Sequence, residues 1–148
     1  FRRVLFRSND NFDPENSHVV AGIMRRIHEA HTTGASSMTA WGSGSPMREL
    51  IDADDLADAC VFLMREHTNG GLVNVGSGDE ISIRDLTHLL AEIVGYQGEI
   101  LWDTSKPDGT PRKIMDNSQL FQTGWRPQSN IETGLRKMYS WYLSQQSA

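Results

Sequence analysis

Short strand candidates alternate with capped amphipathic helices along this chain, and this alternation limits the possible folds more than any other feature. The best-marked helix follows a capping pair at Ser82 and Asp85 and stops at Gly95. Strand candidates lie on either side of it, at Leu72–Val75 and Glu99–Trp102. This order of elements is typical of α/β or α+β proteins.

The other elements are predicted from apolar spacing and capping residues. They are helices from about Ser17, from Asp54, from Asp116 to Gly124 and from the Ser129/Glu132 capping box, and strands at Met38–Trp41 and Met47–Ile51. Cys60 falls on the apolar stripe of the helix after Asp54, so we expect its thiol in the core. Because Cys60 is the only cysteine, the chain cannot form an internal disulfide.

The stretch Trp41–Leu50 has an unusual composition for plain scaffold. Its Gly-Ser-Gly turn allows tight backbone turning and leaves room for a ligand beside the main chain. Trp41 offers a flat apolar face, and Arg48 offers a planar fork of donors suited to phosphate or carboxylate. Together they suit a sugar or aromatic ring that carries an anionic group. The alternative is a Trp that covers the core and an Arg in a surface ion pair.

Three further groups of residues have both a functional and a structural interpretation. His18 is a proton-transfer group or a surface histidine at a helix start. The segment Lys106–Lys113, stiffened by two prolines, is an anion-binding loop or a solvated one. The acids between Asp52 and Asp58 are explained by capping and the helix dipole as well as by metal binding, and we predict no metal site.

Composition excludes several partners. The 148 residues suffice for one domain, and the net charge of −5 argues against nucleic acid and anionic membrane surfaces. No apolar run approaches a membrane span, so we expect a cytoplasmic protein. Residues 1–8 hold three Arg and no acid, and the string Arg3–Ser8 resembles translated sequencing-adaptor sequence. We therefore expect residues 1–8 to be a non-native segment and leave them out of the fold; the alternative is a basic arm that binds a polyanion.

Five motifs in order carry a resemblance to a known family. They are Asn9-Asp10-Asn11-Phe12, Asn16-Ser17-His18-Val19, Trp41-Gly42-Ser43-Gly44-Ser45-Pro46-Met47-Arg48-Glu49, Asn74-Val75-Gly76-Ser77-Gly78 and Lys106-Pro107-Asp108-Gly109-Thr110-Pro111-Arg112-Lys113. From Asn9 to about Gln145 the chain resembles the GDP-L-fucose synthase family of the extended short-chain dehydrogenase/reductase superfamily. These enzymes are NADPH-dependent 3,5-epimerase/4-reductases of GDP-4-keto-6-deoxy-mannose.

The resemblance implies a fold, a cofactor and site residues. Residues 9–145 would be the substrate-binding C-terminal region, made of the closing elements of a Rossmann domain and a smaller α/β domain. His18 matches the family's catalytic acid, which also lies beside NADP(H). The positions that contact the GDP-sugar are matched by Arg26, Trp41, Arg48 and Asp108. Arg112 is a further candidate for offsetting pyrophosphate charge. The full-length enzymes are typically homodimers.

Other family features are absent from the sequence. No glycine-rich dinucleotide turn is present, no Tyr is followed four residues later by Lys, and Cys60 does not match the family's partner cysteine. We therefore expect the NADP-binding half to be missing and this piece to be inactive alone. The alternatives are another nucleotide-sugar epimerase, reductase or dehydratase of the superfamily, a stand-alone nucleotide-sugar-binding module, or a piece that does not fold by itself.

Overall fold

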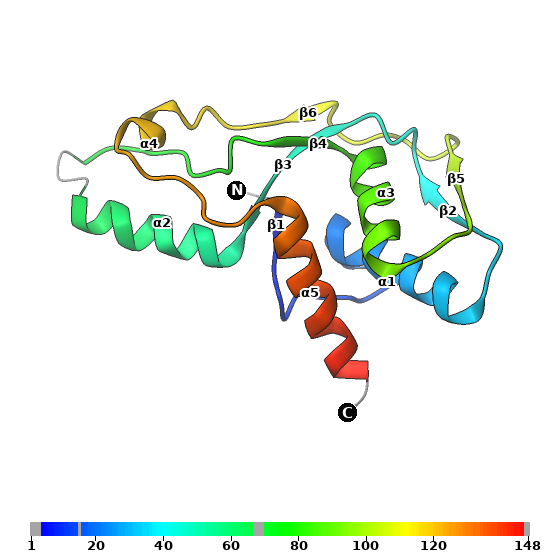
Figure 1. Cartoon of the computed structure of the whole chain (residues 1–148). Coiled ribbons are helices and arrows are strands. Elements are labelled where there is room, and N and C mark those ends of the chain that lie inside the picture. Colours follow the sequence, from blue (N-terminus) through cyan, green and yellow to red (C-terminus); the bar gives the residue numbers. More distant parts are fainter. Residues whose placement is uncertain (1–3, 15, 67–69, 147–148) are drawn as a thin grey trace.

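The computed structural model describes residues 4–14, 16–66 and 70–146, and its strands and helices alternate as expected for the α/β class (Figure 1). The elements are β1 (Val4–Phe6), α1 (Val19–Thr33), β2 (Ser37–Trp41), β3 (Met47–Asp52), α2 (Ala53–Glu66), β4 (Glu80–Ser82), α3 (Ile83–Val94), β5 (Glu99–Asp103), β6 (Arg112–Lys113), α4 (Ser118–Gln122) and α5 (Ile131–Gln146). No helix in the described ranges is long and apolar enough to cross a membrane.

Strand β3 is the centre of the larger sheet. Its C-terminal half pairs in parallel with β1, and its N-terminal half pairs with β4 antiparallel and with β6 in parallel. Strands β2 and β5 form a separate parallel pair. Figure 1 shows β3 running from the α1 and α3 region to α2, so one strand connects the two parts of the molecule.

Two hydrophobic cores lie in these two parts. The larger core joins α1, α3 and α5, where Met24, Leu90 and Leu135 have no exposed surface. The smaller core holds α2 and the chain around α4, with Ala59 and Trp125 buried in it. The apolar stripes predicted for α1, α3 and α5 are therefore the faces that pack together.

Helix α3 has the boundaries that its capping residues predict. The Ser82 Oγ accepts a hydrogen bond from the Asp85 backbone N at 2.9 Å. At the other end Gly95 has the left-handed conformation, with φ of 83°. Local capping chemistry alone thus fixes the helix that packs against α1.

Four predicted helix starts are wrong by one or two residues. Helix α4 begins at Ser118 rather than Asp116. Helix α1 begins at Val19, after Ser17. Helix α2 is capped by Asp52, whose Oδ1 accepts from the Asp54 backbone N at 3.0 Å. At α5 the capping oxygen belongs to Asn130 rather than Ser129. In each case several polar residues adjoin the start, and every one of them can cap.

The strand predicted at Leu72–Val75 is not formed. Val75 is buried, but Leu72 is 96% exposed, and the segment is irregular. An apolar run becomes a strand only where a neighbouring strand can satisfy its backbone groups. None pairs with this segment among the described residues.

The expectation that residues 1–8 lie outside the fold is wrong for the part that the structure describes. Val4–Phe6 forms β1 and pairs with Leu50–Asp52, and the Phe6 side chain is 2% exposed. Phe6 lies against Gly134, where a side chain on that residue would overlap its ring. Residues 1–3 fall outside the described residues.

Cys60 is exposed, in contrast to the prediction that it lies in the core. Helix α2 has two apolar faces, because Ala57, Cys60, Val61 and Met64 repeat at helical spacing on the side away from Ala59. Met64 is 86% exposed. Apolar spacing identifies both faces but does not say which one is buried.

An exposed thiol should react quickly with a thiol reagent. We expect Ellman's reagent to modify the native chain at a rate within about threefold of a free cysteine, because exposure governs access to the sulfur. The unfolded chain in urea serves as the reference. If the native chain reacted about a hundredfold more slowly than the unfolded chain, Cys60 would be buried in the core after all.

Candidate functional site

The Gly-Ser-Gly turn after β2 is fastened to the loop between β5 and β6. Asp108 accepts hydrogen bonds from the Ser43 backbone N at 2.8 Å and the Ser43 Oγ at 2.6 Å. Gly42 has φ of 79°, and a Cβ there would overlap the Asp108 carboxylate. Glycine is required at this position because the loop approaches so closely.

These hydrogen bonds lower the pKa of Asp108 below its ordinary value of 3.8, the Ser43 hydroxyl contributing most. A lowered pKa in the folded state means that the contact is present above about pH 4 and is lost as pH falls through the folded pKa. We expect the Ser43 amide proton resonance to titrate with a midpoint below 3.8. Asp108→Asn should remove that step. A midpoint at or above 3.8 would contradict the contact.

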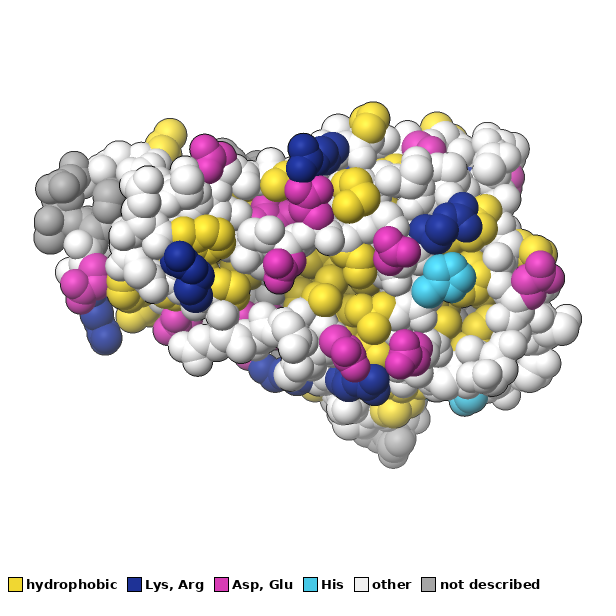
Figure 2. All heavy atoms as spheres, turned by 45° about the horizontal axis from the view of Figure 1, so that its top comes forward, with side chains coloured by type: hydrophobic (Ala, Val, Ile, Leu, Met, Phe, Trp, Pro, Cys, Tyr) yellow, Lys and Arg dark blue, Asp and Glu magenta, His cyan; other side chains and the backbone are white. Residues whose placement is uncertain are grey.

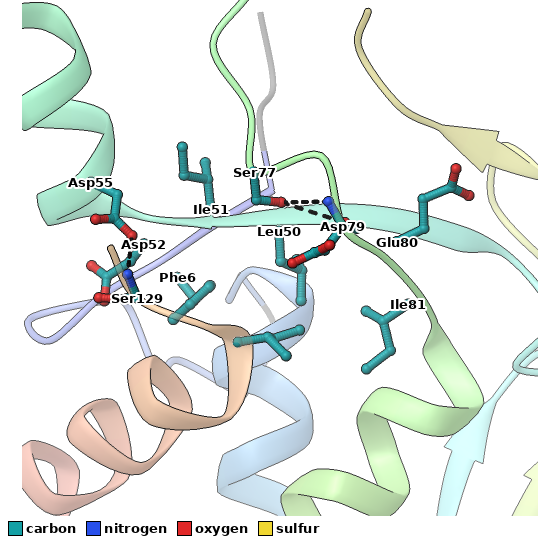
Figure 3. A pocket seen from close by; sticks show the side chains of 11 residues that line it. Phe6, Leu50, Ile51, Asp52, Asp55, Ser77, Asp79, Glu80, Ile81 and Ser129 are labelled. Atoms are coloured by element: carbon teal, nitrogen blue, oxygen red, sulfur yellow. Dashed lines mark hydrogen bonds between the residues drawn. The ribbon is translucent and has the colours of Figure 1, made fainter. Parts of the chain in front are cut away.

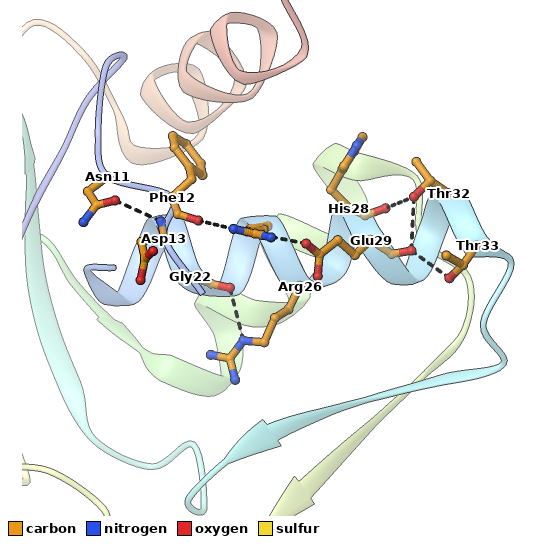
Figure 4. Close-up of polar contacts among 10 residues, drawn as sticks. Asn11, Phe12, Asp13, Gly22, Arg26, His28, Glu29, Thr32 and Thr33 are labelled. Carbon is orange, nitrogen blue, oxygen red and sulfur yellow. Dashed lines mark hydrogen bonds and ion pairs between the residues drawn. The ribbon is translucent and has the colours of Figure 1, made fainter. Parts of the chain in front are cut away.

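Trp41 has two cationic side chains near its ring and remains open to solvent. The residue is 65% exposed. The Arg26 guanidinium lies 5.4 Å and the Lys106 Nζ 5.9 Å from the centroid of the Trp41 ring. The Arg26 Nε donates to the Gly22 carbonyl, one turn earlier in α1, at 3.1 Å, which holds the start of the guanidinium against the helix (Figure 4). Burial lowers the pKa of Arg26. The result is an accessible aromatic face with positive charge beside it.

Arg48 projects from β3 and holds the same loop. Its Nη1 donates to the Met47 carbonyl at 2.7 Å and to the Thr110 carbonyl at 2.8 Å. A pocket of about 190 Å³ opens here. It is lined by Val19, Trp41, Gly44, Pro46, Arg48, Ile83, Pro107, Asp108 and Gly109. The structure thus brings three of the predicted substrate-contacting residues into one pocket, and Arg26 joins them through Trp41.

His18 lies at the start of α1, next to a pocket residue. It is the N-cap residue, its side chain makes no capping hydrogen bond, and no acid follows in the first turn. The side chain is 67% exposed. His18 is not itself among the residues lining the pocket, but Val19, its neighbour, is. The positive end of the α1 dipole therefore faces the same region as Arg48.

A second pocket, beneath β3, has the opposite electrical character (Figure 3). Its apolar lining includes Phe6 and Ile81, and its acids are Asp52, Asp55, Asp79 and Glu80. The space-filling view in Figure 2 shows acidic side chains around an apolar area near the middle of the face that it draws. An anionic ligand would be repelled here, so the Trp41 pocket is the better site for one.

Two residues near the site have roles that sequence reasoning did not predict. The Glu49 carboxylate is buried and accepts from the Gly78 backbone N at 2.8 Å and the Met115 backbone N at 3.0 Å. Arg112, a candidate for pyrophosphate, is instead paired with Glu80 at 2.5 Å. These contacts join segments 29 to 66 residues apart, which no local motif encodes.

Known proteins are similar to this chain in sequence and in fold. Residues 5–76 match the family model described as NAD dependent epimerase/dehydratase family. Putative GDP-L-fucose synthase 2 of Arabidopsis thaliana is 54% identical over 94% of this chain and 42% of its own length. Residues 5–76, just under half of the chain, are thus similar to this family. GDP-L-fucose synthase of Escherichia coli (strain K12) is 43% identical over 96% of the chain and 47% of its own length.

A solved structure has a similar fold. A GDP-L-fucose synthetase from Naegleria fowleri bound to NADP superposes with a TM-score of 0.88 at 25% identity, covering 97% of this chain and 46% of that one. The chain thus spans less than half the length of these family members.

Proposed function

We propose that the chain is the substrate-binding part of a GDP-L-fucose synthase, comprising residues 9–145. The whole enzyme would carry out NADPH-dependent 3,5-epimerisation and 4-reduction of GDP-4-keto-6-deoxy-D-mannose to GDP-L-fucose. The names of the relatives at 43–54% identity support this assignment. As the family resemblance implies, the whole enzyme would be a homodimer. This chain alone would not convert the substrate.

The Trp41 pocket is the observation that carries the proposal. An exposed aromatic face, the cations of Arg26 and Lys106 beside it, and the Arg48 fork match a ring joined to a pyrophosphate. The uncapped start of α1 adds backbone donors for an anion. The Asp108 loop would close over the bound ligand from the other side.

His18 would supply proton transfer. A 4-keto group acidifies the hydrogens at C3 and C5, so epimerisation needs an acid and a base placed beside those carbons. An imidazole can serve as either near neutral pH. Its exposed side chain, next to the pocket residue Val19, is free to meet a sugar held there.

The residues described here do not form a cradle for NADP(H). Such a cradle needs a glycine-rich turn between a strand and a helix, where backbone donors bind the pyrophosphate. Strand β3 runs directly into α2, and β4 runs directly into α3. We therefore assign no step of hydride transfer to these residues, and only His18 is proposed to touch the cofactor.

A different GDP-sugar is the second candidate. GDP-L-colitose synthase of Yersinia pseudotuberculosis is 34% identical over 97% of the chain and 47% of its own length. Its name, like those of the other relatives, refers to a GDP-sugar. The pocket residues that contact the nucleotide would therefore serve both candidate substrates. The identity of the sugar distinguishes the two candidates.

Ligand contacts can be mapped by NMR. We expect GDP-mannose to shift the indole N–H resonance of Trp41 and the backbone resonances of Val19 and Gly109. The Trp125 indole, which donates to Asp58 in the other core, is the internal control. Shifts confined to the acidic pocket beneath β3, or no shifts in a folded chain, would contradict the proposal.

A further inference from the structure

The loop before α1 is fixed in place by contacts with two helices. The Arg25 Nη1 on α1 donates to the Phe12 carbonyl at 2.8 Å (Figure 4). The Phe12 ring packs against Tyr142 of α5, with centroids 4.5 Å apart. The loop consequently folds back, and Asp10 comes beside His18 although eight residues separate them.

Asp10 is a buried carboxylate next to an exposed imidazole. Its side chain is 2% exposed, whereas that of His18 is 67% exposed. The Asp10 Oδ1 accepts from the Asn11 backbone N at 2.8 Å and lies 3.3 Å from the His18 Nδ1. No hydrogen bond to the His18 Nε2 is present within the described part of the chain.

A buried carboxylate requires donors, and within the described ranges the His18 imidazole is the side chain at hydrogen-bond distance from Asp10. We propose that Asp10 is a positioning residue that holds the neutral His18 ring as its Nδ1–H tautomer. The Nε2 lone pair is then free to take a proton from a sugar carbon and to return one. In hydrolases, a carboxylate that accepts a hydrogen bond from the Nδ1–H of the catalytic histidine orients the ring in this way. The inference deepens the proposed function, because it rests on His18 as the proton-transfer group.

Ring nitrogen shifts report the tautomer directly. A long-range ¹H–¹⁵N correlation spectrum of the ¹⁵N-labelled chain, at about pH 8.5 where a histidine of ordinary pKa is neutral, distinguishes a protonated Nδ1 from a protonated Nε2. His18→Gln assigns the signals. We expect at least about a tenfold excess of the Nδ1–H form, since a charged acceptor strengthens the hydrogen bond.

Substitution of Asp10 should reverse that preference. In Asp10→Asn we expect the Nε2–H form, which free histidine favours, to predominate. Asp13→Asn is the matched control, because it removes a carboxylate from the same loop at a residue that accepts from the Asn16 backbone N. That variant should keep the wild-type tautomer.

Each outcome decides the inference. A wild-type spectrum with the proton on Nε2 overturns it, even if Asp10→Asn does not fold. An unchanged Nδ1–H form in folded Asp10→Asn overturns it as well. The spectrum needs no ligand, so failure of GDP-mannose to bind would count against the proposed function and leave the Asp10–His18 pair standing.

Discussion

Arg48→Ala should weaken GDP-mannose binding by roughly 30- to 150-fold. The Arg48 fork lies in the Trp41 pocket, and hydrogen bonds from a charged donor to pyrophosphate oxygens contribute about 2–3 kcal/mol to binding. The substitution also removes the hydrogen bond from Arg48 to the Thr110 carbonyl. The loop that carries Asp108 is then held less firmly. Calorimetric titration of both chains measures the change.

Two further variants separate charge from geometry. Arg136→Ala on α5 removes the same charge from an exposed pair with Glu132 and should leave the affinity unchanged. Arg48→Lys keeps the charge but loses the planar fork, and we expect an affinity between those of Arg48→Ala and the wild type. Equal affinities for Arg48→Ala and Arg136→Ala would exclude Arg48 from the site.

Glu49→Ala should cause the largest loss of stability, about 3–4 kcal/mol in the free energy of unfolding. The carboxylate accepts from the Gly78 and Met115 backbone N atoms and from the Asn117 Nδ2 at 2.5 Å. Its removal leaves three donors without an acceptor, one of them on the buried Asn117 side chain, and such unpaired groups are costly. For a chain of this size, the melting temperature should fall by about 10 °C.

Urea unfolding followed by circular dichroism measures this loss. The matched control is Glu29→Ala on α1, because Glu29 forms an exposed pair with Arg25 at 2.6 Å. Exposed pairs of this spacing contribute about 0.3–0.5 kcal/mol. If Glu49→Ala unfolded at the same urea concentration as Glu29→Ala, the Glu49 contacts would contribute no more than a surface pair.

Elements whose ends are marked by nearby capping residues or glycines could be predicted from the sequence. The Ser82 cap and the Gly95 stop define α3, and the β2 and β5 strands lie where alternating apolar residues place them. The Trp41–Leu50 stretch could be proposed as a site because a glycine turn, an aromatic ring and an Arg occur together. Such features depend on residues within a few positions of each other.

Features that depend on distant partners could not be predicted. The side of α2 that is buried is decided by contacts with Trp125, so Cys60 was assigned to the wrong face. Leu72–Val75 has the composition of a strand but no neighbour to pair with in the described chain. Glu49 resembles any charged strand residue until the Met115 segment meets it, 66 residues later.

The central claim is that the Trp41 pocket recognises a GDP-sugar. The most direct measurement is calorimetric titration of the chain with GDP-mannose, with UDP-glucose as the control and circular dichroism to establish that the chain is folded. Our account predicts saturable heat with GDP-mannose, none with UDP-glucose at the same concentration, and loss of the heat in Arg48→Ala. A folded chain that binds UDP-glucose as tightly, or binds neither ligand, would contradict it.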